Sequence, residues 1–364
     1  MPKPARPPLD DSQMAGQLLF IGIDGTSLSD ELARRLRSVS PGGIILFARN
    51  LVDGQQVAAF CRELDTLLPV RPFLAIDQEG GRVNRLKGIF PEIPPNLHLA
   101  GQEDAEERVR THGRETGRGL RLLGFNLNFA PVLDLSTAES PNGIGDRAYG
   151  SDPRRVAQLA EIFLDAQRGE GVLGCGKHFP GLGEGRVDSH LDLPVITKSS
   201  AALWSRDLVP YRELRDRLPM IMVGHAFYPD LQGPAPGPAT LSEPVVQRLL
   251  RERIGYRGVI LTDDLEMGAV DQKADPGEVA WQALQAGNDM MMYCKSWERI
   301  EAAHHFLHRK IRSGSLPTRR LNASLERLFD LKDALASAGA PAPFRSSALQ
   351  EVCQVLGRLD ATES

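Results

Sequence analysis

The sequence predicts an α/β protein built on a single (β/α)₈ barrel of the TIM type, with extra C-terminal helices. Eight short apolar runs alternate with longer segments in which apolar residues recur every three or four positions. Most of the runs are continuously apolar, as in parallel strands that are covered on both faces. An open doubly wound sheet would also alternate strands and helices, but eight evenly repeated units favour closure into a barrel.

The elements follow one another in regular order along the chain. The predicted strands lie at 18–23, 43–47, 73–77, 125–129, 172–177, 220–224, 259–263 and 289–293. The predicted helices lie at 28–39, 55–67, 108–123, 153–168, 199–215, 243–253, 277–286 and 295–312, with Ser27, Asp53, Asp152 and Ser242 as candidate N-caps. Two further helices are expected within 317–359. This order predicts an N-terminal extension at 1–14, the barrel at 15–316 and C-terminal helices packed on it at 317–364.

Composition and charge narrow the class of protein. The 43 basic and 47 acidic residues leave a net charge of −4, which gives no reason to expect nucleic acid or an anionic membrane as a partner. The N-terminus lacks the apolar core of a signal peptide, and no run of about 18 apolar residues occurs, so a cytoplasmic location is expected. The four cysteines are scattered without a CxxC pair, which predicts free thiols. A monomer is expected.

Polar residues gather where the predicted strands end. Long connections at 135–150, 178–197 and 225–240 follow three strands, and such loops mark the catalytic face of a barrel. Charged groups at the ends of apolar strands are costly to bury unless they form ion pairs or take part in binding or catalysis. Five of the eight strands end this way, in Asp77, Asp134, Lys177-His178, His225 and Asp263-Asp264. The pattern predicts an enzyme with a polar ligand.

The segment 176–190 is the richest in candidate site residues. Lys177 and His178 can each donate hydrogen bonds to sugar hydroxyls. Asp188 and His190 lie two residues apart, so an extended loop could aim both side chains the same way, and a carboxylate held against an imidazole orients the ring and makes it a better base. An isolated Asp-x-His is more often an uncoupled surface pair. The Gly-x-Gly near residue 181 lacks the spacing of a phosphate-binding loop.

Asp263 could serve as a nucleophile, a metal ligand or a structural acceptor. The metal role is weakened because no His or Asp cluster with ligand spacing accompanies it. We therefore expect neither a metal nor a cofactor.

Six segments together resemble glycoside hydrolase family 3, and within it the single-domain β-N-acetylglucosaminidases (β-hexosaminidases) of the NagZ type. They are AIDQEGGRVNR (75–85), FAPVLD (129–134), GDR (145–147), KHFPG (177–181), DSH (188–190) and TDDL (262–265). The resemblance covers roughly residues 15–335.

The resemblance implies a role for each matching residue. Asp263 corresponds to the nucleophile of a retaining hydrolase, and His190 to the acid/base with Asp188 as its dyad partner. The residues that correspond to sugar ligands are Asp77, Arg85, Arg147, Lys177 and His178.

The resemblance also implies the substrate. It is non-reducing terminal GlcNAc on GlcNAc-1,6-anhydro-MurNAc and its peptides, the muropeptide fragments handled in cell-wall recycling. Leu182 and Glu266 depart from the family pattern, which bears on fine substrate contacts.

Three other functions stay open at this point. A phosphorylase would pass the sugar to inorganic phosphate, because a neutral histidine repels phosphate less than a carboxylate does. A barrel aldolase would use Lys177 as a Schiff base. A non-catalytic sugar-binding barrel would be favoured if Asp263 or His190 were replaced, and both are present.

Overall fold

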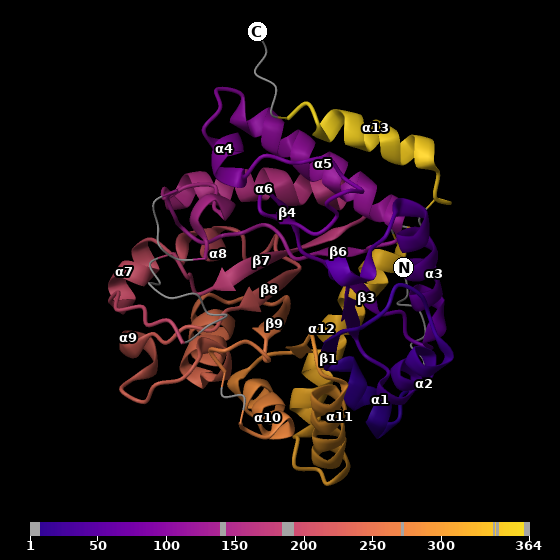
Figure 1. Cartoon of the computed structure of the whole chain (residues 1–364). Coiled ribbons are helices and arrows are strands. Elements are labelled where there is room, and N and C mark those ends of the chain that lie inside the picture. The colour runs from indigo at the N-terminus through magenta and orange to yellow at the C-terminus, as the bar shows by residue number, and fades with distance from the viewer. Residues whose placement is uncertain are drawn as a thin grey trace.

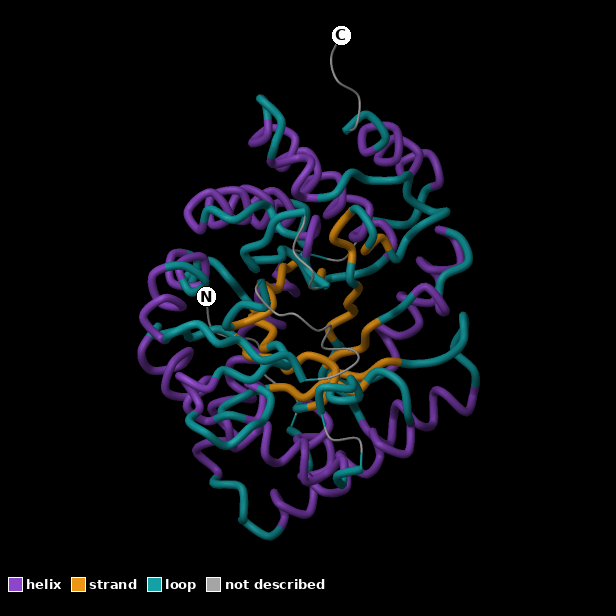
Figure 2. The backbone as a smooth tube through the Cα atoms, turned by 60° about the vertical axis from the view of Figure 1, so that its left-hand side comes forward, coloured by secondary structure: helices purple, strands orange, loops and turns teal. Residues whose placement is uncertain are grey.

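A closed barrel of parallel strands lies at the centre of the computed structural model, which describes residues 8–138, 143–183, 193–270, 273–337, 339 and 342–359. The strands follow one another around the barrel in the order β1-β10-β9-β8-β7-β6-β3-β2. Helices surround them, as Figure 1 and Figure 2 show from two directions. The predicted fold class is confirmed.

All eight predicted strands occur, most of them shortened at the ends. Their bounds are β1 Leu19–Gly22, β2 Gly43–Ile45, β3 Phe73–Ile76, β6 Leu127–Asn128, β7 Leu173–Phe179, β8 Met220–Val223, β9 Val259–Asp264 and β10 Met290–Tyr293. A small antiparallel hairpin, β4 Gln78–Gly80 with β5 Val83–Asn84, follows β3 directly. This hairpin, which the sequence did not predict, lies at the carboxyl end of the barrel and carries part of the site.

The helices on the barrel exterior also follow the predicted order. They are α2 Asp30–Val39, α3 Gly54–Leu67, α5 Ala105–Leu123, α6 Pro153–Gly169, α7 Ser200–Ser205, α8 Val209–Glu213, η4 Pro244–Arg253, α10 Pro276–Ala286 and α11 Trp297–Arg312. Shorter elements in the loops are η1 Ala48–Asn50, α4 Asn96–Ala100, η2 Gly145–Arg147, α9 Pro229–Gln232 and η3 Ala239–Leu241. Outside the eight repeated units lie α1 Asp11–Gln17, α12 Thr318–Ser337 and α13 Ser346–Leu356.

One predicted helix, 199–215, is two helices, α7 and α8. Pro210 lies in the first turn of α8, and in a continuous helix its ring would clash with the carbonyl of Arg206. At the break, the carboxylate of Asp207 turns inward and accepts hydrogen bonds from Lys198 Nζ at 2.9 and 2.8 Å. The prediction of one helix here was wrong because the inward ion pair and the proline outweigh the helical spacing of the apolar residues.

Two of the four predicted caps are correct. Asp53 and Asp152 accept hydrogen bonds from backbone amides in the first turns of α3 and α6. The N-cap of α2 is Ser29 rather than Ser27, because the helix begins two residues later than predicted. Ser242 makes no side-chain cap, because η4 is a π-helix whose N-cap is Glu243.

The inside of the barrel is filled by aromatic and branched side chains. The ring of Phe20 on β1 packs 5.2 Å from that of Phe129 and 6.5 Å from that of Phe73, centroid to centroid. Gly43 on β2 makes room for this ring, because a Cβ there would lie 2.3 Å from it. This packing explains why a glycine begins a buried strand.

Helix α12 runs across the end of the barrel at which the strands begin. Arg327 pairs at 2.9 Å with Asp289, the residue before β10, and Lys332 donates at 2.8 Å to Gln17, which ends α1 ahead of β1. In Figure 1, α13 lies against α5, away from this end. Both tail helices were predicted. Helix α1 was not predicted, because a helix of 7 residues is too short to show a clear periodicity. It crosses the predicted boundary between the N-terminal extension and the barrel, after residue 14.

Lys332 provides a test of how α12 is held. Its Nζ lies 5.1 Å from the centre of the fully buried Phe73 ring, and burial lowers the pKa of Lys332 to about 7. Between pH 7 and 10.5 the folded chain then binds fewer protons here than the unfolded chain, so this group makes the free energy of unfolding rise with pH. We expect Lys332→Met to raise that free energy by about 1–2 kcal/mol at pH 6 and by less at pH 9, measured by urea unfolding. Equal effects at both pH values would contradict this account.

Two further features concern the cysteines and the possibility of a membrane-spanning helix. Cys61, Cys175, Cys294 and Cys353 are free thiols, and the first three are buried. Among the helices that the structure describes, none has the length and hydropathy needed to cross a membrane.

Candidate active site

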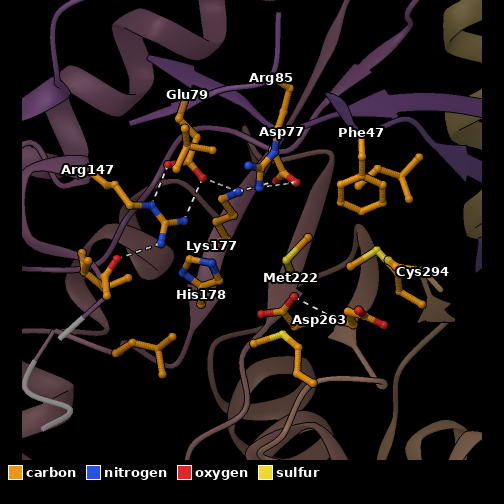
Figure 3. Close-up of a pocket in the computed structure, with 18 of the residues that line it drawn as sticks. Phe47, Asp77, Glu79, Arg85, Arg147, Lys177, His178, Met222, Asp263 and Cys294 are labelled. Carbon is orange, nitrogen blue, oxygen red and sulfur yellow. Dashed lines mark hydrogen bonds and ion pairs between the residues drawn. The ribbon is translucent and has the colours of Figure 1, made fainter. Parts of the chain in front are cut away.

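A cavity of about 340 Å³ opens at the end of the barrel where the strands finish. Its wall is charged on one side and apolar on another (Figure 3). The charged side includes Asp77, Glu79, Arg85, Arg147 and Lys177, and Phe47 and Cys294 lie on the apolar side. Further apolar residues that line the cavity are Ile45, Met222, Met267 and Met292. Asp263 also lines the cavity and lies below the charged side in this view.

The charged side is a chain of ion pairs between segments far apart in sequence. Lys177 on β7 places its Nζ 2.7 Å from Asp77 Oδ1 and 2.5 Å from Glu79 Oε1. Arg147 on η2 grips the same Glu79 with two hydrogen bonds, each of 2.8 Å. The turn from β3 into the β4–β5 hairpin positions both acids, because Asp77 lies between β3 and β4 and Glu79 lies on β4. Glu79 is therefore the centre of the cluster, a role that the sequence analysis did not assign to it.

Glu79 and Lys177 are both ionised at neutral pH. Burial alone would raise the pKa of Glu79, but Arg147 and Lys177 hold it well below its usual range. Burial alone would lower the pKa of Lys177, but Asp77 and Glu79 raise it above its ordinary value. A lysine held protonated by two carboxylates is a poor nucleophile, so the geometry argues against the Schiff-base aldolase.

Arg85 is held less tightly than the other cations of the cluster. Its nearest guanidinium nitrogen lies 4.0 Å from Asp77 Oδ2, and its Nε is buried without a hydrogen-bond partner among the described residues. The side chain is 37% exposed and lines the cavity. Its donors are thus available to a ligand.

His178 is oriented by a buried carboxylate. Asp134 Oδ2 lies 2.7 Å from His178 Nδ1 and accepts the backbone N–H of His178 at 3.1 Å. Because a carboxylate accepts at Nδ1, that nitrogen carries a proton, and Nε2 is left for the cavity. Asp134 Oδ1 also accepts from the amide of Leu182 at 2.6 Å, which fixes the chain just before residue 184. Asp134 was noted as a strand-end acid but not assigned to the site.

Asp263 lies at the tip of β9, among positive partners. Burial alone would raise its pKa, but His225, His178, the backbone N–H of Asp264 and Lys177 together hold the pKa below its ordinary value. The Asp264 amide donates to Asp263 Oδ1 at 2.8 Å. The carboxylate is thus ionised, faces the cavity and is available to react.

His225, at the end of β8, fixes the backbone beside Asp263. Its Nε2 lies 2.9 Å from the carbonyl oxygen of Asp264, and its Nδ1 lies 2.6 Å from Thr240 Oγ1. Asp264 also lines the cavity, and burial, with Glu266 and Asp263 nearby, raises its pKa to about 6. The sequence places His225 at the end of a strand without a role, and only its contacts across strands assign one to it.

The two departures from the family pattern have different environments. Leu182 lines the cavity. Glu266 does not line it, and its carboxylate accepts hydrogen bonds from the amides of Lys295 at 2.6 Å and Ser296 at 3.1 Å. Glu266 thus holds the two residues just ahead of α11, whose N-cap is Ser296, and its carboxylate faces the backbone there and not the cavity.

The structure brings six of the eight predicted site residues together: Asp77, Arg85, Arg147, Lys177, His178 and Asp263. Asp188 and His190 lie outside the described residues. In the described parts of the chain, no group of three or more His, Cys, Asp or Glu side chains is arranged to hold a metal ion.

A comparison with models of protein families assigns the chain to one family. Residues 12–331 match the model of the glycosyl hydrolase family 3 N-terminal domain. The chain belongs to this family. It is a glycoside hydrolase, and the matched residues include the whole barrel.

Relatives of this family 3 enzyme cover most of its length. A β-hexosaminidase of Thiobacillus denitrificans is 37% identical over 282 residues, which are 76% of this chain and 77% of that protein. A β-hexosaminidase of Pseudomonas aeruginosa is 36% identical over 291 residues, 80% and 86% of the two chains.

Solved structures of family 3 enzymes have the same fold. A β-N-acetylglucosaminidase from Paenibacillus superposes with a TM-score of 0.88 at 35% identity, over 97% of this chain and 68% of that one. Native NagZ from Neisseria gonorrhoeae superposes with a TM-score of 0.73 at 30% identity, over 90% and 98%.

Proposed function

We propose that the protein is a retaining β-N-acetylhexosaminidase that removes non-reducing terminal GlcNAc, with Asp263 as nucleophile and His190, paired with Asp188, as acid/base. The observation that carries the proposal is the ionised carboxylate of Asp263, which faces a cavity whose opposite wall is a chain of donors and acceptors suited to sugar hydroxyls. The β-hexosaminidase names of its relatives support the sugar specificity.

The proposed reaction has two steps. Asp263 attacks the anomeric carbon while the bond to the leaving oxygen breaks, and His190 donates a proton to that oxygen. A water molecule then attacks the same carbon, gives its proton to His190 and releases Asp263. Lys177 and the imidazoles of His178 and His225 keep Asp263 anionic between turnovers.

Asp77, Arg85, Arg147, Lys177 and His178 would hold the sugar. Glu79 holds Arg147 and Lys177 in place before a ligand binds. Arg85, by contrast, has an Nε–H group without a hydrogen-bond partner among the described residues. Pre-ordered groups lose little entropy when they bind a ligand, which favours a fixed position of the anomeric carbon over Asp263.

The chain on both sides of residues 184–192 is anchored beside the cavity. Leu182 and Pro194 line it, and Phe227 on the neighbouring loop exchanges backbone hydrogen bonds with residues 194 and 196. His190 is four residues from Pro194 in the sequence, which supports a proton donor that acts from the mouth of this cavity.

We further propose GlcNAc-1,6-anhydro-MurNAc and its peptides as the natural substrates, and cell-wall recycling in the cytoplasm as the setting. This part rests on the family resemblance and on the NagZ neighbour.

The first test is cleavage of p-nitrophenyl β-GlcNAc and β-glucose, with and without phosphate. We expect release from the GlcNAc compound alone, independent of phosphate, with His190→Gln reducing kcat by about 10²-fold or more. Activity that requires phosphate would instead indicate a phosphorylase. No cleavage of either glycoside would contradict the proposed reaction.

A further inference from the structure

The β4–β5 hairpin, which carries Glu79, depends on its neighbours for a fixed position. Its two strands have only 3 and 2 residues, and its turn contains Gly80 and Gly81, with φ angles of 95° and 55°. A two-stranded hairpin is marginally stable by itself, and glycine loses more conformational freedom than any other residue when it is fixed. The place of the Glu79 carboxylate is therefore set by the groups that pack against this turn.

The turn is packed against the backbone of one loop and against one side chain. A Cβ on Gly80 would lie 3.2 Å from the carbonyl oxygen of Pro94, and 3.2 and 3.3 Å from Cε1 and Nε2 of His112. The amide of Gly81 donates to the carbonyl of Ile93 at 2.8 Å. Among these neighbours, only the ring of His112 is a side chain, so it is the support that a substitution can remove.

His112 lies on α5 and is fully buried. Its ring meets that of Phe163 on α6 edge to face, with 5.2 Å between the ring centres, and the two helices lie side by side (Figure 1). Glu79 lines the cavity, whereas His112 does not. The histidine can therefore affect a bound sugar only through the hairpin.

Hydrogen bonding does not explain the presence of a histidine at this position. Neither ring nitrogen of His112 has a hydrogen-bond partner among the described residues, and burial lowers its pKa to about 4, so the ring is neutral at pH 7. A buried polar ring without hydrogen bonds costs stability compared with an apolar ring of similar size. What His112 contributes is therefore the shape of its ring, packed between α6 and the turn.

We propose that His112 is a positioning residue of the sugar site, whose ring holds Gly80 and, through it, the carboxylate of Glu79. The inference rests on the proposed function, because it takes the charged cluster to bind the sugar. Without the ring, the hairpin is free to shift toward α5, and Glu79 then loses its close contacts with Arg147 and Lys177. Since a misplacement of about 1 Å can cost about 10²-fold, a smaller shift should weaken GlcNAc binding by about five- to tenfold.

The inhibition constant of free GlcNAc against cleavage of p-nitrophenyl β-GlcNAc tests this role. In His112→Ala, that constant and KM should both rise by about five- to tenfold. Because Asp263 lies on β9 and not on the hairpin, kcat should change by less than about twofold. If His112→Ala is not recovered as a folded protein, His112→Leu takes its place, because it fills more of the space but has no planar ring.

Two further variants separate positioning from a general loss of packing. His112→Phe keeps a planar ring against Gly80, so its inhibition constant should stay within about twofold of wild type. Leu123→Ala also removes a fully buried side chain from α5, about 16 Å farther along the helix. It should lower the free energy of unfolding and leave the inhibition constant unchanged.

An unchanged inhibition constant without the ring, or an equal rise in Leu123→Ala, would overturn the role of His112. If wild type does not cleave p-nitrophenyl β-GlcNAc, the proposed function fails instead. The contact can then still be tested by urea unfolding of wild type, His112→Ala, Glu79→Gln and the double variant. Positioning predicts that the two substitutions are not additive in the free energy of unfolding, and additivity would overturn it, so the two failures are distinguishable.

Discussion

Replacement of Asp263 by alanine should lower kcat for p-nitrophenyl β-GlcNAc by about 10³-fold or more, with the chain still folded. The nucleophile is lost and only binding and proton donation remain. Sodium azide should restore part of the rate, because a small anion can enter the space that the carboxylate leaves and attack the anomeric carbon directly. The product would then be the α-glycosyl azide, of inverted configuration, which NMR identifies.

The isosteric Asp263→Asn separates chemistry from binding. It keeps the shape of the side chain and an acceptor for the Asp264 amide at Oδ1, so its affinity for GlcNAc should be close to that of wild type while kcat falls. Rescue by azide without inversion, or a rate in Asp263→Ala near that of wild type, would show that another group attacks the sugar. Asp264 would be the first to examine, because its carboxyl also lines the cavity.

The barrel could be predicted from the sequence because each strand is short and continuously apolar. Periodicity within single segments is enough to place the eight barrel strands in order, though not the β4–β5 hairpin, and the carboxyl ends of parallel strands meet at one face. The same argument brought Asp77, Lys177, His178 and Asp263 to one cavity before any contact was known.

The partners of these residues could not be predicted in the same way. Glu79 binds Lys177 across 98 residues of sequence, Asp134 binds His178 across 44, and His225 reaches the backbone of Asp264. Each pairing depends on the exact end of a strand and on a short hairpin or turn. Local sequence patterns do not fix such details, since they place an element only within a few residues.

Glu79→Gln should be the most damaging change to the site outside the nucleophile. Glu79 is fully buried between Arg147 and Lys177, so two carboxylates face two cations in this cluster. Glutamine has the same size, but it removes the charge and turns an NH2 group toward a guanidinium or an ammonium group. Breaking a buried pair in this way leaves a cation uncompensated, which costs about 3–5 kcal/mol in the free energy of unfolding.

The loss of the Glu79 charge should also affect catalysis, because the sugar is then bound more weakly. Without Glu79, Arg147 and Lys177 lose their fixed positions, and a shift of about 1 Å can cost about 10²-fold in kcat/KM. We expect the inhibition constant of free GlcNAc to rise together with KM, which a purely structural defect in a still-folded protein would not cause. Asp65→Asn is the matched control, because it breaks an exposed pair with Arg71 and should change neither quantity.

The pH dependence separates charge from shape at this position. Because the folded pKa of Glu79 lies below its unfolded value of 4.5, its contribution to stability is present above that pH and fades as the pH falls further. Wild type should therefore lose stability steeply on acidification, and Glu79→Gln should show a shallower loss, measured by urea unfolding between pH 7 and pH 3. Parallel curves for the two proteins, or an unchanged inhibition constant, would mean that Arg147 and Lys177 are positioned by Asp77 and the backbone and not by Glu79.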